Sequence, residues 1–164
     1  MDYEIRLLTS KDSVDYRQLR LHALKNFPTY YGTSYDEALE KTDASYVQMI
    51  EKYDIFGVYL NQEISAIAMF AQAEGKHTEH FGNIYQVYVH KDKQNLSIGS
   101  KLMGAVIEHA KTKVQQIYIC VSAHNKAAIA LYKKFDFEIY GTEPKSLYID
   151  NNYYDEHLMV KFLK

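Results

Sequence analysis

Cysteine is almost absent from this chain of 164 residues: Cys120 is the only one, so no internal disulfide can form. A chain without disulfides suits a reducing compartment, and the segment from Met1 to Glu4 lacks the features of a signal peptide, so we expect a cytoplasmic location. No apolar run approaches the ~20 residues that cross a bilayer, so no membrane association is expected. The net charge of −2 lacks the strong basic excess typical of nucleic-acid-binding proteins, so no nucleic-acid partner is expected.

Proline and glycine are also scarce, at two and seven residues, so few points interrupt the chain. Nearly half of the residues (47%) are hydrophobic, which is typical of a globular protein and argues against a disordered chain. The sequence shows no internal repeat, low-complexity tract or linker. We therefore expect a single domain over residues 1–164, long enough to bury one core.

The hydrophobic pattern switches between the period of strands and the period of helices. The predicted element order is β-α-α-β-β-β-α-β-α-β-β, which favours a mixed α/β sheet with helices on both faces. Strands are predicted at residues 3–8, 55–60, 64–73, 84–90, 117–121, 137–140 and 153–162, and helices at 13–27, 43–53, 97–111 and 125–135.

The first predicted helix carries apolar residues on two sides and ends before Pro28, which cannot continue it. A helix of this kind is expected to be covered on more than one face. One side holds Val14, Leu21 and Leu24, and the other holds Tyr16, Leu19, Ala23 and Phe27.

Polar residues mark other boundaries. Thr42 or Asp43 is a suitable N-cap for the second helix. Residues 61–62 (Asn-Gln) predict a hairpin turn, and the polar segment 74–80 predicts a loop. Residues 141–144 are rich in turn formers and are expected to separate the last two strands.

The most informative segment is QNLSIG, residues 94–99, which lies between a predicted strand and a predicted helix. The first N–H groups of a helix have no internal partner, and the helix dipole favours negative charge there. A turn that leads into such a helix forms a concave site for an anion such as a pyrophosphate. The alternative is an ordinary strand-to-helix turn without a ligand.

Three motifs together resemble the GNAT superfamily of acetyl-CoA-dependent N-acetyltransferases. The first is VYVH at 87–90 followed by QNLSIGSKL at 94–102, similar to the pyrophosphate loop of the family and its helix. The second is NKAAIALYKKFDF at 125–137, similar to the N-x-x-A-x-x-L-Y-x-x-x-G-F block. The third combines YGTEP at 140–144 with YYDEHLM at 153–159. The resemblance implies a GNAT-like, mainly antiparallel sheet flanked by helices on both faces.

The chain departs from the family pattern at three positions where glycine is usual: Asn95, Ser97 and Asp136. Gly99 is retained. Asn tolerates the left-handed backbone region better than other non-glycine residues, and Ser is small and polar. We therefore expect the phosphate site to persist, with weaker binding.

The resemblance implies that acetyl-CoA is the cosubstrate. It assigns the pyrophosphate to the N–H groups of residues 96–100 and the pantetheine arm to main-chain groups of the preceding strand. Asn125 would contact the CoA arm, although it is equally suited to cap its own helix. The implied cofactor-binding residues are Val87, Tyr88, Val89, Gln94, Asn95, Leu96, Ser97, Ile98, Gly99, Ser100, Asn125 and Tyr132.

The resemblance places Tyr132 beside the CoA sulfur, where a phenol can act as general acid for the departing thiolate. The alternative for Tyr132 is a core tyrosine with a locally satisfied hydroxyl. No carboxylate lies on the strand before the loop, so the general base stays open, with Glu79, His77 and His80 as loop candidates.

Cys120 lies between apolar residues, so we expect it to be buried and inert rather than an acyl carrier. The histidines are scattered and predict no metal site.

Tyrosine-rich segments at 27–32 and 148–154 are expected to shape the acceptor site, with Tyr30, Tyr31 and Tyr85 as substrate-binding residues. The function implied is transfer of an acetyl group to a primary amine, on a small molecule or a peptide N-terminus, by direct attack in a ternary complex. The alternative is a catalytically idle acyl-CoA-binding sensor or interaction module. Many relatives form dimers, so a homodimer is left open.

Overall fold

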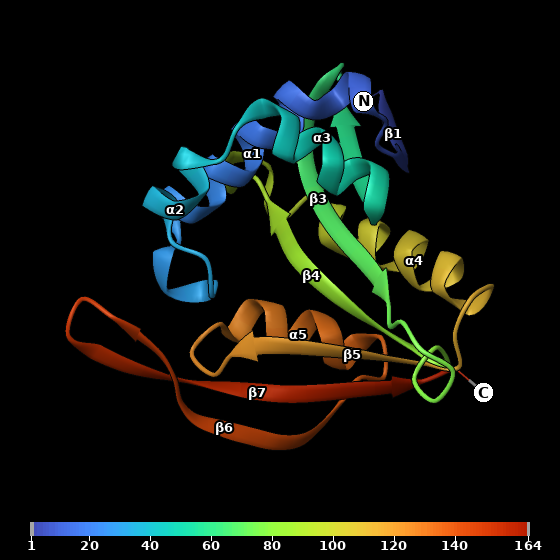
Figure 1. The fold of residues 1–164 in the computed structure, drawn as a ribbon, viewed down its shortest axis with the longest axis vertical. Helices are drawn as coiled ribbons and strands as arrows, with labels where there is room; N and C mark the ends of the chain where they lie inside the picture. Colours follow the sequence, from blue (N-terminus) through green and yellow to red (C-terminus); the bar gives the residue numbers. More distant parts are fainter. Residues whose placement is uncertain (1, 164) are drawn as a thin grey trace.

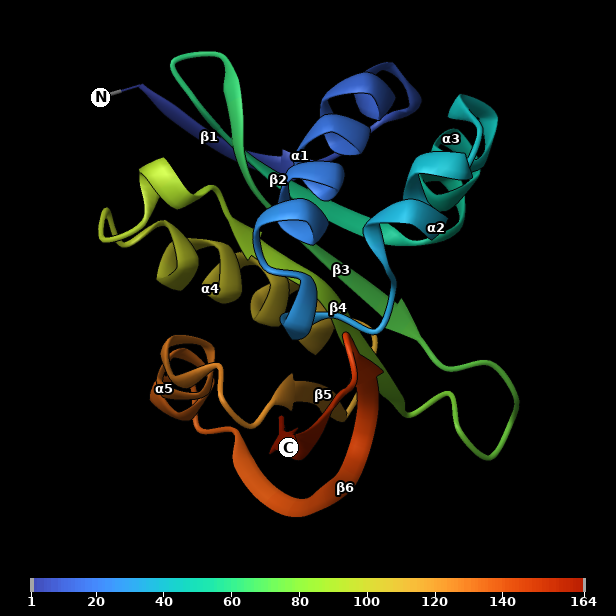
Figure 2. The same cartoon turned by 90° about the vertical axis from the view of Figure 1, so that its left-hand side faces the viewer.

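The computed structural model describes residues 2–163 and consists of one seven-stranded sheet with helices on both faces (Figures 1 and 2). The strand order is β1-β2-β3-β4-β5-β7-β6, and every neighbouring pair is antiparallel except β4 and β5. The strands are β1 (Tyr3–Leu7), β2 (Asp54–Leu60), β3 (Glu63–Gln72), β4 (Phe81–Val89), β5 (Gln116–Ser122), β6 (Glu138–Ile149) and β7 (Asn152–Phe162). The predicted fold class is confirmed.

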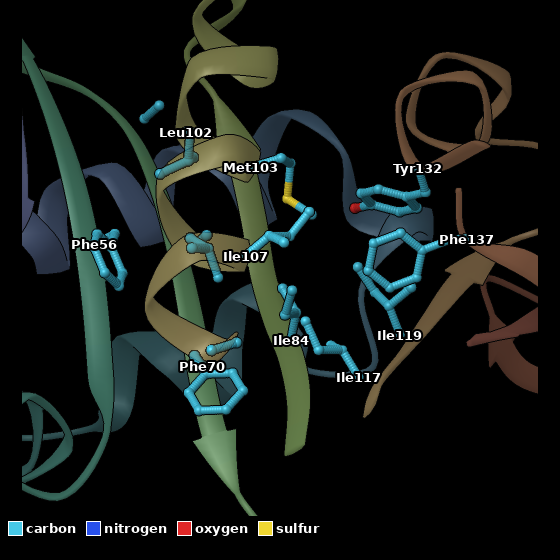
Figure 3. Packing of buried hydrophobic residues seen from close by; sticks show 14 of the residues in the cluster. Phe56, Phe70, Ile84, Leu102, Met103, Ile107, Ile117, Ile119, Tyr132 and Phe137 are labelled. Atoms are coloured by element: carbon cyan, nitrogen blue, oxygen red, sulfur yellow. The ribbon is translucent and has the colours of Figure 1, made fainter. Parts of the chain in front are cut away.

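Helices α1 (Ser13–Asn26), α2 (Tyr35–Glu40) and α3 (Asp43–Lys52) belong to one face of the sheet, and α4 (Ile98–Lys111) and α5 (Lys126–Lys134) belong to the other. Each face has its own apolar cluster. The cluster under α4 and α5 is shown in Figure 3, where Met103 and Ile107 lie near the strand residue Ile84. The cluster under α1 and α3 includes Leu19 and Tyr46.

The two parallel strands at the centre of the sheet separate along their length. β4 and β5 are paired only from Phe81 with Gln116 to Ile84 with Ile119, and beyond this point they diverge into a V (Figure 1). A bulge in β4 accompanies the divergence: Gln86 has φ 57°, and the register with β3 shifts there. Bulges bend a strand and redirect its side chains.

Side chains from the α1 face hold this distorted strand. The Tyr16 hydroxyl donates to the Gln86 side-chain oxygen at 2.5 Å. The short 3₁₀ turn η2 (Pro28–Tyr30) spans the open end of the V. It is attached to β5 because the Ser122 hydroxyl donates to the Thr29 carbonyl at 2.9 Å. Residues 28–30 are therefore fixed beside the diverging ends of β4 and β5.

Most predicted boundaries agree with the structure, including the Thr42 cap and the turn at Asn61, which has φ 48°. The two-sided burial of α1 was predicted correctly for Leu24 but wrongly for Val14, which is 60% exposed. Helix α2 was not predicted, since it has only six residues and buries only Ala38.

The predicted turn at residues 141–144 is also wrong, because β6 continues through it to Ile149. The strand tolerates Pro144 since β6 is at the edge of the sheet and its register shifts between Glu143 and Leu147. The chain reverses instead at Asp150 and Asn151, both in the left-handed region, with φ of 49° and 64°.

Candidate active site

A cavity of about 510 Å³, here called cavity A, lies between the end of β4, the start of α4 and helix α5. It collects nearly all residues predicted to hold the cofactor. Leu96 is the exception: it is 41% exposed and is not part of the wall. The predicted residues in the wall are Val87, Tyr88, Val89, Gln94, Asn95, Ser97, Ile98, Gly99, Ser100, Asn125 and Tyr132.

The N-terminus of α4 opens into cavity A without a capping side chain. Ser97 occupies the N-cap position in the left-handed region (φ 61°, ψ 18°), and its hydroxyl makes no capping hydrogen bond. By contrast, Asn125 accepts from the Ala128 N–H and caps α5. The unpaired N–H groups at the start of α4 therefore offer an anion site, and Lys93 adds a positive charge to the same wall.

The three departures from glycine have a common backbone explanation. Asn95, Ser97 and Asp136 all have positive φ, at 69°, 61° and 65°. Glycine adopts this region freely, and other residues do so at a cost of order 1 kcal/mol. The loop before α4 and the turn after α5 thus keep the backbone shape that glycine would give.

Gly99 faces the interior at close range. A Cβ at this position would lie 3.3 Å from Leu131 Cδ2 and 3.7 Å from Val89 Cγ2. The close approach of α4 to α5 and β4 therefore favours glycine here. A group bound at the start of α4 would meet backbone rather than a side chain at this position.

A second cavity of about 590 Å³, cavity B, lies where β4 and β5 diverge. The two cavities share five wall residues: Tyr30, Tyr31, Val87, Asn125 and Tyr132. We call these five residues the junction. The predicted substrate-binding residues Tyr30, Tyr31 and Tyr85 all belong to the wall of cavity B.

Tyr132 lies at the junction on α5 and is only 4% exposed. Its ring lies 6.0 Å from that of Phe137, and its hydroxyl points away from the helix that carries it (Figure 3). Burial raises the pKa of the Tyr132 phenol, so it stays protonated at neutral pH. The Tyr132 hydroxyl makes no hydrogen bond that lowers its pKa within residues 2–163. It can therefore donate its proton to a ligand.

Tyr31 closes the junction from the other side. Its hydroxyl donates to the Val87 carbonyl at 2.9 Å, just after the bulge in β4. Burial raises the pKa of Tyr31 as well, so it is a permanent donor at neutral pH. The Val89 carbonyl accepts from the Gln94 side chain at 3.3 Å, which fixes the start of the loop.

Cavity B contains charged residues that the sequence did not indicate as functional. Glu156 on β7 is the only carboxylate in its wall, and the cations are Arg20 and Lys41. The Ser146 hydroxyl donates to Glu156 and orients it. The candidate bases Glu79, His77 and His80 belong to neither wall.

The expected burial of Cys120 is wrong: this residue is exposed and lines cavity B. It lies beyond the last pairing of β4 with β5, where the sheet leaves its face uncovered. Partial burial raises the pKa of its thiol, with Glu156 and Glu143 adding to the effect. The thiol is therefore protonated at neutral pH and a poor nucleophile.

The expected acceptor segment 148–154 contributes less than the one at 27–32. Tyr148 and Tyr153 are 62% and 59% exposed, their tilted rings lie 4.8 Å apart, and neither belongs to the wall of cavity B. They lie at the tip of the β6–β7 hairpin. In the other segment, Tyr30, Tyr31 and Gly32 do line the cavity.

Within residues 2–163, no group of three or more His, Cys, Asp or Glu side chains is arranged to hold a metal ion. None of the helices in the described part of the chain has the length and apolar character needed to cross a membrane.

Comparison with known proteins identifies a family that matches this chain. The family model described as the acetyltransferase (GNAT) family matches residues 17–137. An uncharacterized N-acetyltransferase of Methanocaldococcus jannaschii is 27% identical over 142 residues, which cover 83% of this chain and 61% of that protein. The chain thus spans about three fifths of the length of this curated relative.

Solved structures share the fold over almost the whole chain. An acetyltransferase of the GNAT family from Streptococcus pneumoniae has a TM-score of 0.88 at 22% identity, covering 99% of this chain and 100% of that one. A Salmonella typhimurium protein described as a putative acetyltransferase, solved with its cofactor acetyl-CoA, has a TM-score of 0.88 at 17% identity, covering 100% and 95%. From the family match over most of its length, the chain belongs to the acetyltransferase (GNAT) family.

Proposed function

We propose that this protein transfers the acetyl group of acetyl-CoA to a primary amine by direct attack in a ternary complex. The observation that carries the proposal is the pair of cavities that share Tyr132, Val87 and Asn125 in their walls. One cavity offers an anion site at a helix N-terminus, and the other is large enough for a small acceptor or the end of a peptide.

Acetyl-CoA would supply an activated acetyl thioester. The N–H groups at the start of α4 would bind its pyrophosphate, helped by the helix dipole and Lys93. The main-chain groups of β4 past the bulge at Gln86, which are no longer paired with β5, would hold the pantetheine arm in the manner of an added strand. The thioester would then lie at the junction.

The reaction forms a bond from the amine nitrogen to the carbonyl carbon and breaks the bond to sulfur. A neutral amine loses one proton as the amide forms and the sulfur gains one, and an ammonium group must first lose a further proton to a base. Tyr132 is the proposed donor to sulfur, because its buried phenol is protonated and makes no competing hydrogen bond within residues 2–163.

Glu156 is the proposed general base. It supplies the only carboxylate in the wall of cavity B, and the Ser146 hydroxyl fixes its orientation. A base is needed because an α-amino group has a pKa of ~8 and a lysine amine of ~10.4, so both carry a proton at neutral pH. Glu156 would take the proton directly or through one water molecule.

The test combines binding with turnover. Calorimetry is expected to show acetyl-CoA binding to the purified protein, and free-thiol release is expected with one amine class from a panel of polyamines, amino acids, aminoglycosides and short peptides. Binding without release from any amine would favour the idle acyl-CoA sensor instead. Absence of acetyl-CoA binding would refute the proposal.

A further inference from the structure

Arg20 on α1 is a buried cation without a carboxylate partner. Its side chain is 6% exposed, and its Nη1 atom is buried with no hydrogen-bond partner within residues 2–163. The ionisable groups that act on it are the phenols of Tyr16, Tyr31 and Tyr46, which are neutral at ordinary pH. No Asp or Glu side chain is among them.

This arrangement is costly unless something else balances the charge. Transferring an unpaired ion out of water costs several kcal/mol, and buried arginines are therefore normally paired. The two other arginines of the chain are more exposed, and each has a carboxylate nearby. Arg6 binds Asp12 through two hydrogen bonds of 2.8 and 3.0 Å. Arg17 lies 3.7 Å from Asp43 and donates to the Leu39 carbonyl, although its Nε atom, like Arg20 Nη1, is buried without a hydrogen-bond partner within residues 2–163.

The position of Arg20 connects it with the acceptor and not with CoA. Arg20 belongs to the wall of cavity B and is absent from that of cavity A. Its guanidinium carbon lies 5.0 Å from the centre of the Tyr31 ring. Tyr31 in turn donates to the Val87 carbonyl at the junction, so the charge is one aromatic ring away from the proposed site of transfer.

The charges of cavity B also exclude one acceptor class. A pocket for a polyamine needs several carboxylates, but the wall contains Arg20 and Lys41 against the single carboxylate of Glu156. An acceptor with a second amino group would meet a buried positive charge. An acceptor with an anionic group would neutralise that charge, and the planar guanidinium fork suits a carboxylate.

We propose that Arg20 binds a carboxylate of the acceptor, so that the substrate is a small amine that carries a carboxylate, as a free amino acid does. The inference rests on the proposed acetyl transfer and names its substrate class. Glu156 accepts the proton of the amine, and Arg20 fixes the other end of the molecule. The amine and the carboxylate of the acceptor thus match the opposite charges of the wall.

The first test uses matched acceptors with the wild-type protein. Each of several amino acids is compared with its carboxamide and with the amine that lacks the carboxyl group, by thiol release and by mass spectrometry of the product. We expect kcat/KM to fall by ~10²–10⁴ for both analogues, because they leave the buried guanidinium unpaired. An amidated peptide with an aspartate near its N-terminus tests whether a side-chain carboxylate can serve instead.

The second test uses variants. Arg20→Met is expected to remove the preference for the amino acid over its carboxamide and to leave the Kd of acetyl-CoA unchanged. Replacing an unpaired buried ion by an apolar side chain is not expected to lower the melting temperature. Arg17→Met on the same helix, outside both cavity walls, is the control and is expected to keep the preference.

The outcomes separate the two claims. Equal or better transfer to amines without a carboxylate would overturn the role of Arg20 and leave acetyl transfer intact. A preference for the amino acid that persists in Arg20→Met would also overturn it. Faster reaction of the acidic peptide than of any free amino acid would contradict the small-molecule class. Absence of transfer to every amine would overturn the proposed function together with this inference.

Discussion

Replacing Tyr132 by phenylalanine removes one hydroxyl group and keeps the shape of the buried ring. Tyr132 lies at the junction, and no hydrogen bond from residues 2–163 affects the pKa of its hydroxyl. The residue borders both cavities, and the side chain makes no hydrogen bond within residues 2–163 that the substitution would break. We therefore expect Tyr132→Phe to change the free energy of unfolding by less than about 1 kcal/mol.

The same substitution is expected to lower kcat strongly. A general acid contributes ~10²–10⁴ in rate, which corresponds to ~2.7–5.4 kcal/mol of transition-state stabilisation. The Kd of acetyl-CoA is expected to stay within about twofold, because the binding contacts lie in the loop and in β4. Activity should thus fall while stability is kept, which a merely structural tyrosine would not produce.

The assay measures steady-state kinetics, calorimetric binding and denaturant unfolding for the wild type and two variants. Tyr46→Phe is the matched control: Tyr46 is 1% exposed, its hydroxyl donates to the Ala38 carbonyl at 2.9 Å, and it lines neither cavity. This control should lose about 1 kcal/mol of stability and keep its kcat. An unchanged kcat in Tyr132→Phe would remove Tyr132 from the mechanism.

Three further predictions test other parts of the account. Ser100→Glu places a carboxylate in the first turn of α4, beside Lys134, and should raise the Kd of acetyl-CoA at least ~10-fold by charge repulsion. The control Ser100→Gln should have a much smaller effect, and equal effects of the two substitutions in a binding titration would show that charge is not the cause. Glu156→Gln should lower kcat/KM by ~10² at neutral pH with acetyl-CoA binding unchanged, and full activity would exclude Glu156 as the base. Hydrogen bonds from Arg6 hold the pKa of Asp12 well below its ordinary value, so its stabilising effect is present above pH ~4 and is lost as the pH falls through the lowered pKa. Asp12→Asn should therefore cost about 2 kcal/mol in unfolding experiments at pH 7 and progressively less in acid, and a constant difference would contradict this linkage.

Local signals in the sequence predicted much of the fold and of cavity A. The start of α4, the cap of α5 by Asn125 and the turn at Asn61 are short-range features set by backbone chemistry. The residues of the loop are contiguous, so one motif indicates them all. The same holds for the left-handed backbone at Asn95 and Ser97, where the residue types already suggested it.

The charged wall of cavity B was not predictable in this way. Arg20 stands between Leu19 and Leu21 and, as a charged residue, would ordinarily be exposed, yet Tyr16, Tyr31 and Tyr46 from three segments surround it. Glu156 reaches the cavity from β7, far along the chain. Cys120 was expected to be buried because its neighbours are apolar, and only the separation of β4 from β5 exposes it.

The most direct test of direct transfer in a ternary complex is a grid of initial rates in which acetyl-CoA and an accepted amine are both varied. Cavities that share the junction predict intersecting double-reciprocal lines, with both substrates bound before either product leaves. Parallel lines, together with acetylated Cys120 in the mass spectrum after incubation with acetyl-CoA alone, would contradict the account and indicate an acyl-enzyme route.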